Sequence, residues 1–413
     1  MAIETLCVVG LGYIGLPTSI VFAEKGVRVF GVDVNPDTVS AISSGVAPFV
    51  EAEIAEHLAP VVASGMMTAS TTPTSADAII IAVPTPFLED KSADLSYVQA
   101  AGEALAPVLQ SGTLIVLEST LPPGATELFA TWIREARPDL VDENGSLLVD
   151  IAHCPERVLP GRVFIELVTN DRIVGGLTPQ AATRAKDMYS LICEGNILET
   201  DAKTAEMSKC VENSFRDVNI AFANELSLVC DTLGIDVWEL IELANHHPRV
   251  NILKPGPGVG GHCLAIDPWF IVAADPENSR LIRMAREVND AKPDWVIGKI
   301  QTALGANTTP VITTLGLAFK PDIDDLRESP ACKVVTKLAK LYPHGEIRAV
   351  EPNVTSLPVE LDSLPNVHLA DYAAALDNVD VAVLLVDHQE FKKQPTLPNH
   401  VVVIDTRGTW RAQ

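Results

Sequence analysis

The chain has 413 residues, 47% hydrophobic and 20% charged, which is long enough for two or three domains and unlike a disordered protein. Asp and Glu (54) outnumber Lys and Arg (30), and the formal net charge of −24 disfavours binding to nucleic acid or to an anionic membrane. The longest apolar run, Ala78 to Val83, is too short to span a bilayer.

The first elements predict a dinucleotide site. An apolar strand at Leu6–Val9 leads into Gly10-Leu11-Gly12-Tyr13-Ile14-Gly15, followed by a helix at Pro17–Lys25 and a strand at Val27–Val32. The first glycine permits the tight turn, the second lets a pyrophosphate approach, and the third lets helix and strand pack closely. Asp33, after the second strand, can bind the adenosine ribose and would repel a 2′-phosphate, so we expect NAD rather than NADP.

Two later strands extend the same predicted sheet. Ala78–Val83 ends in Pro84-Thr85-Pro86, and Thr113–Leu117 ends in Glu118-Ser119-Thr120. Ligands of doubly wound sheets lie beyond the carboxyl ends of the strands, so we expect these two loops to face the nicotinamide. For the two prolines, a role in simply terminating the strand is an equal alternative.

A long helical pattern covers Asp201–Leu233, without Pro or Gly. We predict a central helix that links two lobes and packs against a second subunit. Lys209 and Asn213 lie four residues apart on one face of this helix, with Glu206 three residues earlier. Taken alone, such a pair is more typical of a solvated helix face than of a catalytic site.

Cys263 follows a stretch rich in glycine and proline, begins or just precedes a helix, and has Asp267 four residues later. A cysteine at a helix N-terminus is a candidate nucleophile. We expect five other cysteines to be buried and inert: Cys7, Cys193, Cys210, Cys230 and Cys332. No pair of cysteines has zinc-binding spacing, and neither do His246, His247 and His262, so we predict no metal and reduced thiols in the cytoplasm.

The last hundred residues repeat the alternation of strand and helix. Strands are predicted at Pro310–Leu317, Glu346–Val350, Val379–Val386 and Val401–Asp405, with a helix at Ser329–Leu341. This second α/β layer has no glycine fingerprint, so it should bind something other than the dinucleotide. Lys320 and Arg327, after its first strand, are candidates for phosphate contact, although basic residues at strand ends are as often only solvated.

Together these blocks resemble the UDP-glucose/GDP-mannose dehydrogenase family across essentially the whole chain. The resemblance rests on GLGYIGLP (Gly10–Pro17), EST (Glu118–Thr120), CPERVLPG (Cys154–Gly161), KCVEN (Lys209–Asn213), GVGGHCLAID (Gly258–Asp267) and FKPDIDDLRESP (Phe319–Pro330). It implies an α/β protein with two Rossmann-like doubly wound domains joined by a central helical domain with a long connecting helix. The implied domains are an NAD-binding domain (1–199), a helical dimerisation domain carrying the catalytic Lys and Cys (200–303) and a UDP-sugar-binding domain (304–413).

The resemblance also implies roles for individual residues. Cys263 would form a thiohemiacetal and then a thioester, Lys209 and Asn213 would stabilise oxyanions, Asp267 and Thr120 would hold a water, and Glu156 would be the base for hydrolysis. The implied NAD contacts are Gly10, Gly12, Tyr13, Ile14, Gly15, Asp33, Pro84, Thr85, Ser119, Thr120 and Arg327. The implied substrate contacts are Arg157, Lys209, Asn213, Arg249, Asn251, Lys254, Gly260, Lys320 and Arg407, the last reaching a neighbouring subunit.

The implied reaction is an NAD-dependent four-electron oxidation at C6 of a UDP-N-acetylhexosamine. HCPERVLPG, HHPRVNI and GGHCLAIDPWF favour UDP-N-acetylmannosamine, with UDP-N-acetylglucosamine and UDP-glucose as alternatives. Many members that oxidise UDP-glucose carry a second glutamate where Pro160 stands, which argues against that substrate. Two other classes remain open, a two-electron β-hydroxyacid dehydrogenase and an NAD-sensing protein with a redox cysteine. We expect a cytoplasmic homodimer, or a higher homo-oligomer, that feeds a cell-surface polysaccharide pathway.

Overall fold

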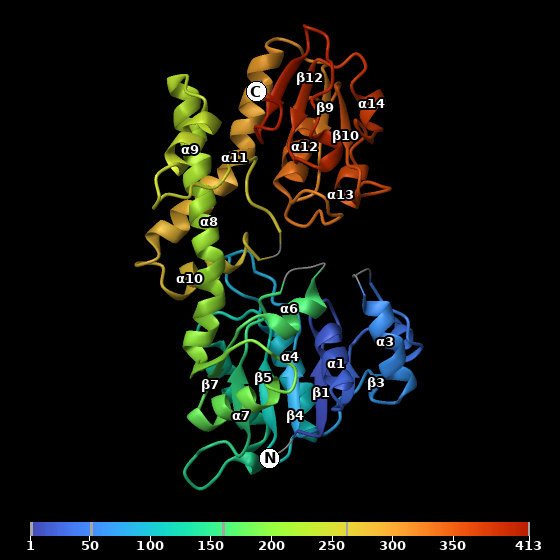
Figure 1. The fold of residues 1–413 in the computed structure, drawn as a ribbon, viewed down its shortest axis with the longest axis vertical. Helices are drawn as coiled ribbons and strands as arrows, with labels where there is room; N and C mark the ends of the chain where they lie inside the picture. Colours follow the sequence, from blue (N-terminus) through green and yellow to red (C-terminus); the bar gives the residue numbers. More distant parts are fainter. Residues whose placement is uncertain (1–2, 50–52, 159–161, 262, 412–413) are drawn as a thin grey trace. The chain divides into compact units, whose positions relative to one another are not determined.

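The computed structural model describes residues 3–49, 53–158, 162–261 and 263–411 (Figure 1). The chain divides into two compact units, Met1–Glu212 and Asn213–Gln413, each built around its own sheet. The predicted α/β class with two Rossmann-like sheets and intervening helices is confirmed. The predicted elements are found with ends shifted by at most two residues.

The first unit contains an eight-stranded sheet in the order β3-β2-β1-β4-β5-β6-β7-β8. All neighbouring strands are parallel except β6 and β7, which pair antiparallel through Ala152–Gly176 and His153–Gly175. Its elements are β1 Thr5–Val9, α1 Gly15–Glu24, β2 Arg28–Val32, α2 Pro36–Ser43, α3 Ile54–Ala63, β3 Met67–Ser70, β4 Ala78–Ile81, α4 Ser96–Leu105, β5 Leu114–Leu117, α5 Ala125–Ala136, β6 Asp150–His153, α6 Val163–Thr169, β7 Arg172–Gly176, α7 Pro179–Tyr189 and β8 Ile197–Asp201.

Both faces of this sheet are buried, because successive side chains of a strand point to opposite sides. Leu6 and Val8 of β1 belong to one core, with residues of α1, α3, α6 and α7, whereas Cys7 and Val9 belong to a second core with α4 and α5. This explains why the strands read as continuous apolar runs rather than as an alternating pattern.

Helix α8, Ala202–Leu233, is a single helix of 32 residues, as predicted. The second unit continues with α9 Val237–Asn245, α10 Asp267–Ala274, α11 Arg280–Leu304, β9 Val311–Leu315, α12 Pro330–Leu341, β10 Glu346–Val350, α13 Val359–Asp362, β11 Val367–Leu369, α14 Tyr372–Ala375, β12 Val381–Leu384 and β13 Val402–Asp405. Its five-stranded parallel sheet has the order β11-β10-β9-β12-β13.

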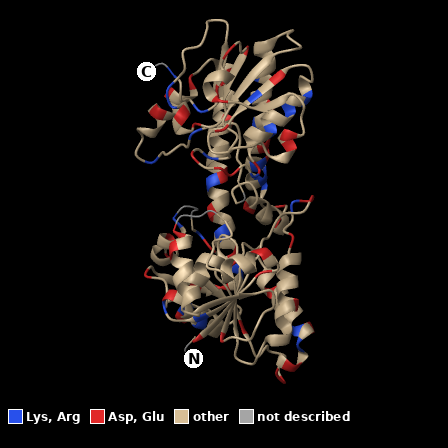
Figure 2. Cartoon of the chain, turned by 90° about the vertical axis from the view of Figure 1, so that its right-hand side faces the viewer, with Lys and Arg blue, Asp and Glu red and all other residues tan. Residues whose placement is uncertain are grey.

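Charged groups are distributed over both units, and acidic side chains occur on each (Figure 2). Among the described residues, no helix combines the length and the apolar composition that crossing a bilayer requires.

Candidate active site

The glycine-rich turn between β1 and α1 is shaped by two of its glycines. Gly10 has a positive φ of 94°, and a Cβ there would lie 2.5 Å from the carbonyl oxygen of Ala82. A Cβ on Gly15 would lie 1.8 Å from the carbonyl oxygen of Gly10. At Gly12, by contrast, a Cβ would meet no described atom within 4 Å, so the backbone is open on that side. This combination fits a turn that receives a pyrophosphate.

Asp33 fixes the other side of this turn. Its Oδ2 accepts a hydrogen bond of 2.9 Å from the Leu11 amide, and its Oδ1 accepts one of 2.9 Å from the Asn35 amide. The half-buried carboxylate is therefore held next to the glycine turn, where an adenosine ribose would lie. Tyr13, within the turn, is 47% exposed and packs on Phe49 with a ring-centroid distance of 4.3 Å.

The loops after β4 and β5 are joined to each other. The Thr85 hydroxyl donates to the carbonyl oxygen of Thr120 at 2.7 Å, and the Ser119 hydroxyl donates to that of Val83, also at 2.7 Å. Pro84 and Thr85 thus share one edge of the sheet with Ser119 and Thr120, as the strand ends predicted. Their contact with a nicotinamide stays a prediction.

The first turns of α8 are anchored beside the loop that carries Thr120. The buried Glu206 carboxylate accepts hydrogen bonds of 2.6 Å from the amides of Gly124 and Thr126 and from the Thr126 hydroxyl. Burial raises the pKa of this carboxyl, and these hydrogen bonds oppose that rise. Glu206 therefore holds the helix in place and caps α5, while the half-buried Lys209 lies one turn further along α8.

Glu156 lies in a cluster of buried charges that the motifs did not reveal. One of its carboxylate oxygens accepts from the Arg157 amide at 2.6 Å, and the other is 3.3 Å from Nη1 of the buried Arg172. The Arg157 side chain, a predicted substrate contact, instead pairs with Glu212 at 2.7 Å. Glu118 and Tyr189 complete this cluster. Glu118 belonged to the EST motif, but neither Arg172 nor Tyr189 stood in a recognisable pattern.

In the second unit, Cys263 lies in a turn that precedes α10. The amides of Ile266 and Asp267 donate to its carbonyl oxygen at 3.0 and 2.9 Å, and its side chain is exposed. The helix begins only at Asp267, because Pro268 occupies one of its first two positions, so the thiol precedes the helix by four residues. The Asn213 amide donates to the buried Asp267 carboxylate at 2.5 Å, which brings two predicted catalytic residues together.

The glycine-rich stretch before Cys263 packs on the segment Phe319–Pro330. A Cβ on Gly260 would lie 2.7 Å from the Glu328 carbonyl oxygen, and one on Gly261 would lie 2.8 Å from the Phe319 ring. The Gly261 amide also donates to the Arg327 carbonyl oxygen at 3.2 Å. Two motifs that are far apart in sequence are therefore packed against each other in the second unit.

The substrate contacts predicted in this unit, and Arg327, a predicted NAD contact, differ in their surroundings. Arg249, Asn251, Lys254 and Lys320 are exposed. Arg327 pairs with Asp325 at 2.6 Å. Arg407 pairs with Asp387 at 2.9 Å and lies so close to Gly256 that a Cβ there would be 2.5 Å from its Nη1. The reach of Arg407 into a neighbouring subunit stays a prediction.

The other cysteines are less accessible than Cys263. Cys7, Cys154, Cys210 and Cys230 are buried, but Cys193 and Cys332 are only half-buried, so the expectation of burial was wrong for these two. Cys193 follows the end of α7 by four residues, and Cys332 lies in the first turn of α12. Burial raises the pKa of Cys7 and Cys332 to about 11 and that of Cys154 to about 12, which keeps these thiols protonated. His262 and Pro160 lie outside the described residues.

The second sheet also has an acidic residue after its second strand, but its contacts are internal. Glu351 follows β10 and accepts from the amides of Leu317 and Ala318 at 2.8 and 3.0 Å, and from His388 at 3.0 Å. Burial alone would raise the pKa of Glu351, yet these hydrogen bonds outweigh it and lower the pKa to about 2. Nδ1 of His388 accepts from the Asp322 amide at 2.9 Å, so its Nε2 carries the proton.

The three parts of the chain match three domain families. Residues 4–193 match the NAD binding domain of the UDP-glucose/GDP-mannose dehydrogenase family, residues 203–291 its central domain, and residues 313–412 its UDP binding domain. The chain belongs to this family. It is accordingly an NAD-dependent dehydrogenase.

Relatives of known name cover the whole chain. A UDP-N-acetyl-D-mannosamine dehydrogenase of Salmonella typhi is 52% identical over 100% of both chains. An NDP-N-acetyl-D-galactosaminuronic acid dehydrogenase of Ralstonia nicotianae is 53% identical over 99% of this chain and 97% of its own. A solved structure, the UDP-D-ManNAc dehydrogenase of Pyrococcus horikoshii, has a TM-score of 0.87 and 38% identity over 99% of this chain and 96% of its own.

Proposed function

We propose that this member of the family oxidises C6 of UDP-N-acetylmannosamine to the carboxylate and releases two NADH. The observation that carries the proposal is the exposed Cys263 in the turn before α10. Asp267, the first residue of that helix, accepts a hydrogen bond from Asn213. A four-electron oxidation needs a nucleophile that adds to the aldehyde, because a free aldehyde has no hydride to give until an adduct forms. A two-electron dehydrogenase would have no use for this cysteine.

The residues of the chain divide the work by their chemistry. Deprotonation of the C6 hydroxyl gives an alkoxide, and the proton leaves through the water that Thr120 and Asp267 would hold. Loss of a hydride from C6 turns the alkoxide into the aldehyde. The Cys263 thiol then adds to the aldehyde carbon, its proton passing to the carbonyl oxygen, to give a thiohemiacetal, and loss of a second hydride from C6 gives the thioester. Lys209 and Asn213 would stabilise the oxyanions, since they offer a cation and an amide donor one turn apart on α8. NAD, when bound, accepts the hydride of each oxidation.

The thioester must finally be hydrolysed. Glu156 would take a proton from water as the new C–O bond forms, and the C–S bond then breaks to release the thiolate and the carboxylate. Arg249, Asn251, Lys254, Gly260, Lys320 and Arg407 would bind the UDP-sugar from the second unit. The family assignment of residues 313–412 as a UDP binding domain supports this role.

The relatives favour a second candidate for the sugar. The Ralstonia nicotianae enzyme is 53% identical to this chain and the Salmonella typhi mannosamine enzyme 52%, so the corresponding N-acetylgalactosamine nucleotide is the alternative. Both substrates are 2-acetamido sugars with a free C6 hydroxymethyl and undergo the same chemistry. The two proposals differ only in which configuration of the sugar is accepted.

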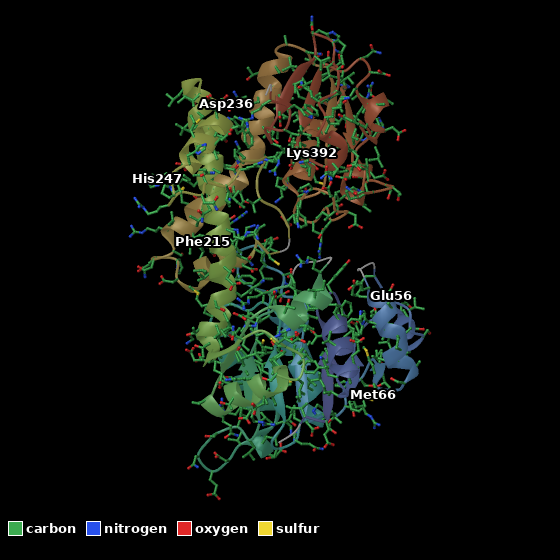
Figure 3. All side chains as sticks on the ribbon, viewed as in Figure 1. Glu56, Met66, Phe215, Asp236, His247 and Lys392 are labelled. Atoms are coloured by element: carbon green, nitrogen blue, oxygen red, sulfur yellow. The ribbon has the colours of Figure 1, made fainter. Side chains whose placement is uncertain are left out.

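We further propose that the enzyme is a homodimer that uses one face of α8. Phe215, Phe222 and Val229 are spaced by seven residues, which places them on one side of the helix, and they are 68%, 54% and 48% exposed. Figure 3 shows Phe215 on α8. Ile220 and Leu226, two further apolar residues of this helix, are half-buried. An exposed apolar row of this size is typical of a surface that binds another chain.

The test is a panel of nucleotide sugars scored by NADH release. UDP-N-acetylmannosamine, UDP-N-acetylgalactosamine, UDP-N-acetylglucosamine and UDP-glucose should be compared at equal concentration with excess NAD. We expect two NADH per molecule of UDP-N-acetylmannosamine and the highest kcat/KM for it. A higher kcat/KM for the galactosamine nucleotide would select the alternative, and one NADH per sugar would refute the four-electron reaction.

A further inference from the structure

Beneath Glu156 lies a group of ionisable side chains to which the proposed mechanism assigns no task. Glu118 follows β5, Arg172 begins β7 and Tyr189 ends α7, and all three side chains are buried. Nη1 of Arg172 is 3.3 Å from a carboxylate oxygen of Glu156 and 4.0 Å from one of Glu118. A single guanidinium therefore faces two carboxyl groups in a place with little solvent.

Glu118 is held from the other side. The Tyr189 hydroxyl donates to its Oε1 at 2.6 Å. Its buried Oε2 makes no hydrogen bond of good geometry with the described residues, although the Thr18 hydroxyl is near enough to lower the pKa of Glu118. An unpaired oxygen in such a place is costly for an ionised carboxylate but tolerable for a protonated one. Burial first, and the nearby Glu156 second, raise the pKa of Glu118 to about 7, against the lowering effects of Arg172, Tyr189 and Thr18.

Arg172 is itself fixed in place. It donates to the Leu167 carbonyl oxygen at 3.2 Å, contacts the Cys154 sulfur at 3.8 Å and lies 4.7 Å from the centre of the Tyr189 ring. Its pKa is raised well above the usual value, because the effects of Glu156, Cys154 and Glu118 outweigh burial, so it stays charged. Burial also raises the pKa of Cys154 and Tyr189, so both stay protonated near neutral pH, where Glu118 changes charge.

We propose that Arg172 is a positioning residue for Glu156, and that Glu118 competes with Glu156 for the same guanidinium. When Glu118 is protonated, Arg172 pairs with Glu156 alone and weakens it as a base. When Glu118 is ionised, it shares Arg172 and adds a like charge, which increases the tendency of Glu156 to take a proton from water. The inference rests on the proposed role of Glu156 in hydrolysing the Cys263 thioester.

The experiment follows thioester hydrolysis against pH in single turnovers, with the Cys263 adduct measured by intact mass after acid quench. In the wild type, the hydrolysis rate should rise through an inflection near pH 7. In Glu118→Gln the inflection should disappear and the rate should stay at the low-pH level. In Tyr189→Phe the inflection should move to higher pH, because the lost hydrogen bond stabilised the ionised Glu118.

Two further variants test the positioning role. Arg172→Lys keeps the charge but loses the planar fork, so it should slow hydrolysis at least about tenfold and leave the KM for the UDP-sugar unchanged. Arg184→Lys is the matched control, because Arg184 pairs with Asp150 at 2.6 Å in the same unit. An inflection retained in Glu118→Gln, or equal effects of the two arginine variants, would overturn the inference.

A measurement without substrate separates this inference from the proposed function. A carboxyl whose pKa is raised on folding stabilises the protein below its unfolded pKa, and that contribution is lost as the pH rises through the folded pKa. The melting temperature of Glu118→Gln, relative to that of the wild type, should therefore increase as the pH rises from 5 to 8. A constant difference would overturn the inference even in an active enzyme. Absence of NADH release from every sugar would refute the proposed function, and with it the role in hydrolysis, while a pH-dependent difference would still support the competition of Glu118 for Arg172.

Discussion

Lys292, on α11, should make the protein less stable at neutral pH than a methionine in its place would. Its side chain is 2% exposed and lies 3.7 Å from the centre of the Trp295 ring, with Nζ donating to the Ser227 hydroxyl. Burial lowers its pKa from 10.5 to about 7, partly offset by Asp231. Between about pH 7 and pH 10.5, the lysine is therefore protonated in the unfolded chain and neutral in the folded chain.

The size of the effect follows from the shift. At about 1.4 kcal/mol per pKa unit, burial of this amine lowers the free energy of unfolding at pH 7 by at most about 4 to 5 kcal/mol, compared with a pH above 10.5 where the amine is neutral in both states. The Ser227 hydrogen bond and the contact with Trp295 return about 2 kcal/mol. Lys292→Met fills a similar volume without a charge, so it should raise the free energy of unfolding by about 1 to 3 kcal/mol at pH 7.

The sign of the pH dependence provides the sharper test. Because the unfolded state holds the extra proton, stability of the wild type should rise with pH above 7, and the advantage of Lys292→Met should shrink by about 1 kcal/mol per pH unit between pH 7.5 and 9. Urea unfolding monitored by tryptophan fluorescence at several pH values measures the stability of the wild type and that of the variant. The exposed Lys337, paired with Asp294, supplies the control variant Lys337→Met. A methionine variant that is less stable, or an advantage independent of pH, would refute the reasoning.

Three other results are expected. Cys263→Ala should lower the rate of acid formation at least about a thousandfold while NAD binding and the fold persist. Iodoacetamide should modify Cys263 before the other cysteines unless UDP-sugar protects it. Release of two NADH per sugar by Cys263→Ala at a normal rate would exclude the thiol from the mechanism. NAD should exceed NADP in kcat/KM by at least about tenfold because of Asp33, and equal values would contradict that role. Phe222→Glu should shift sedimentation toward the monomer, whereas a wild type that is already monomeric at micromolar concentration would exclude the dimer.

The sequence was most informative where backbone shape and chemistry coincide. The turn at Gly10–Gly15 could be predicted because only glycine fits its close approaches, and Asp33 because it must follow the second strand. The long helix α8 followed from an uninterrupted pattern. In contrast, α11 was not predicted, since Pro293 lies inside it and proline normally ends a helix.

The buried charge cluster shows why the rest of the site was out of reach. Glu118, Arg172 and Tyr189 are brought together by three different elements, and nothing in the local sequence of the last two distinguishes them from surface residues. The role of Glu206 was missed for a related reason. Its position three residues before Lys209 placed it only near the same helix face, and its partners, Gly124 and Thr126, are about eighty residues away in the chain.

The internal contacts of Glu351 have a consequence for ligand stoichiometry. In both sheets the acidic residue after the second strand accepts from two backbone amides, but in the second sheet the buried Glu351 also accepts from His388, which a ribose hydroxyl would have to displace. The same order of strands therefore does not create a second dinucleotide site. Titration calorimetry should show one NAD per chain, and a large excess of NAD should not act as a competitive inhibitor against the UDP-sugar. Two sheets of the same strand order can thus take part in one reaction while NAD and the UDP-sugar each bind to only one of them.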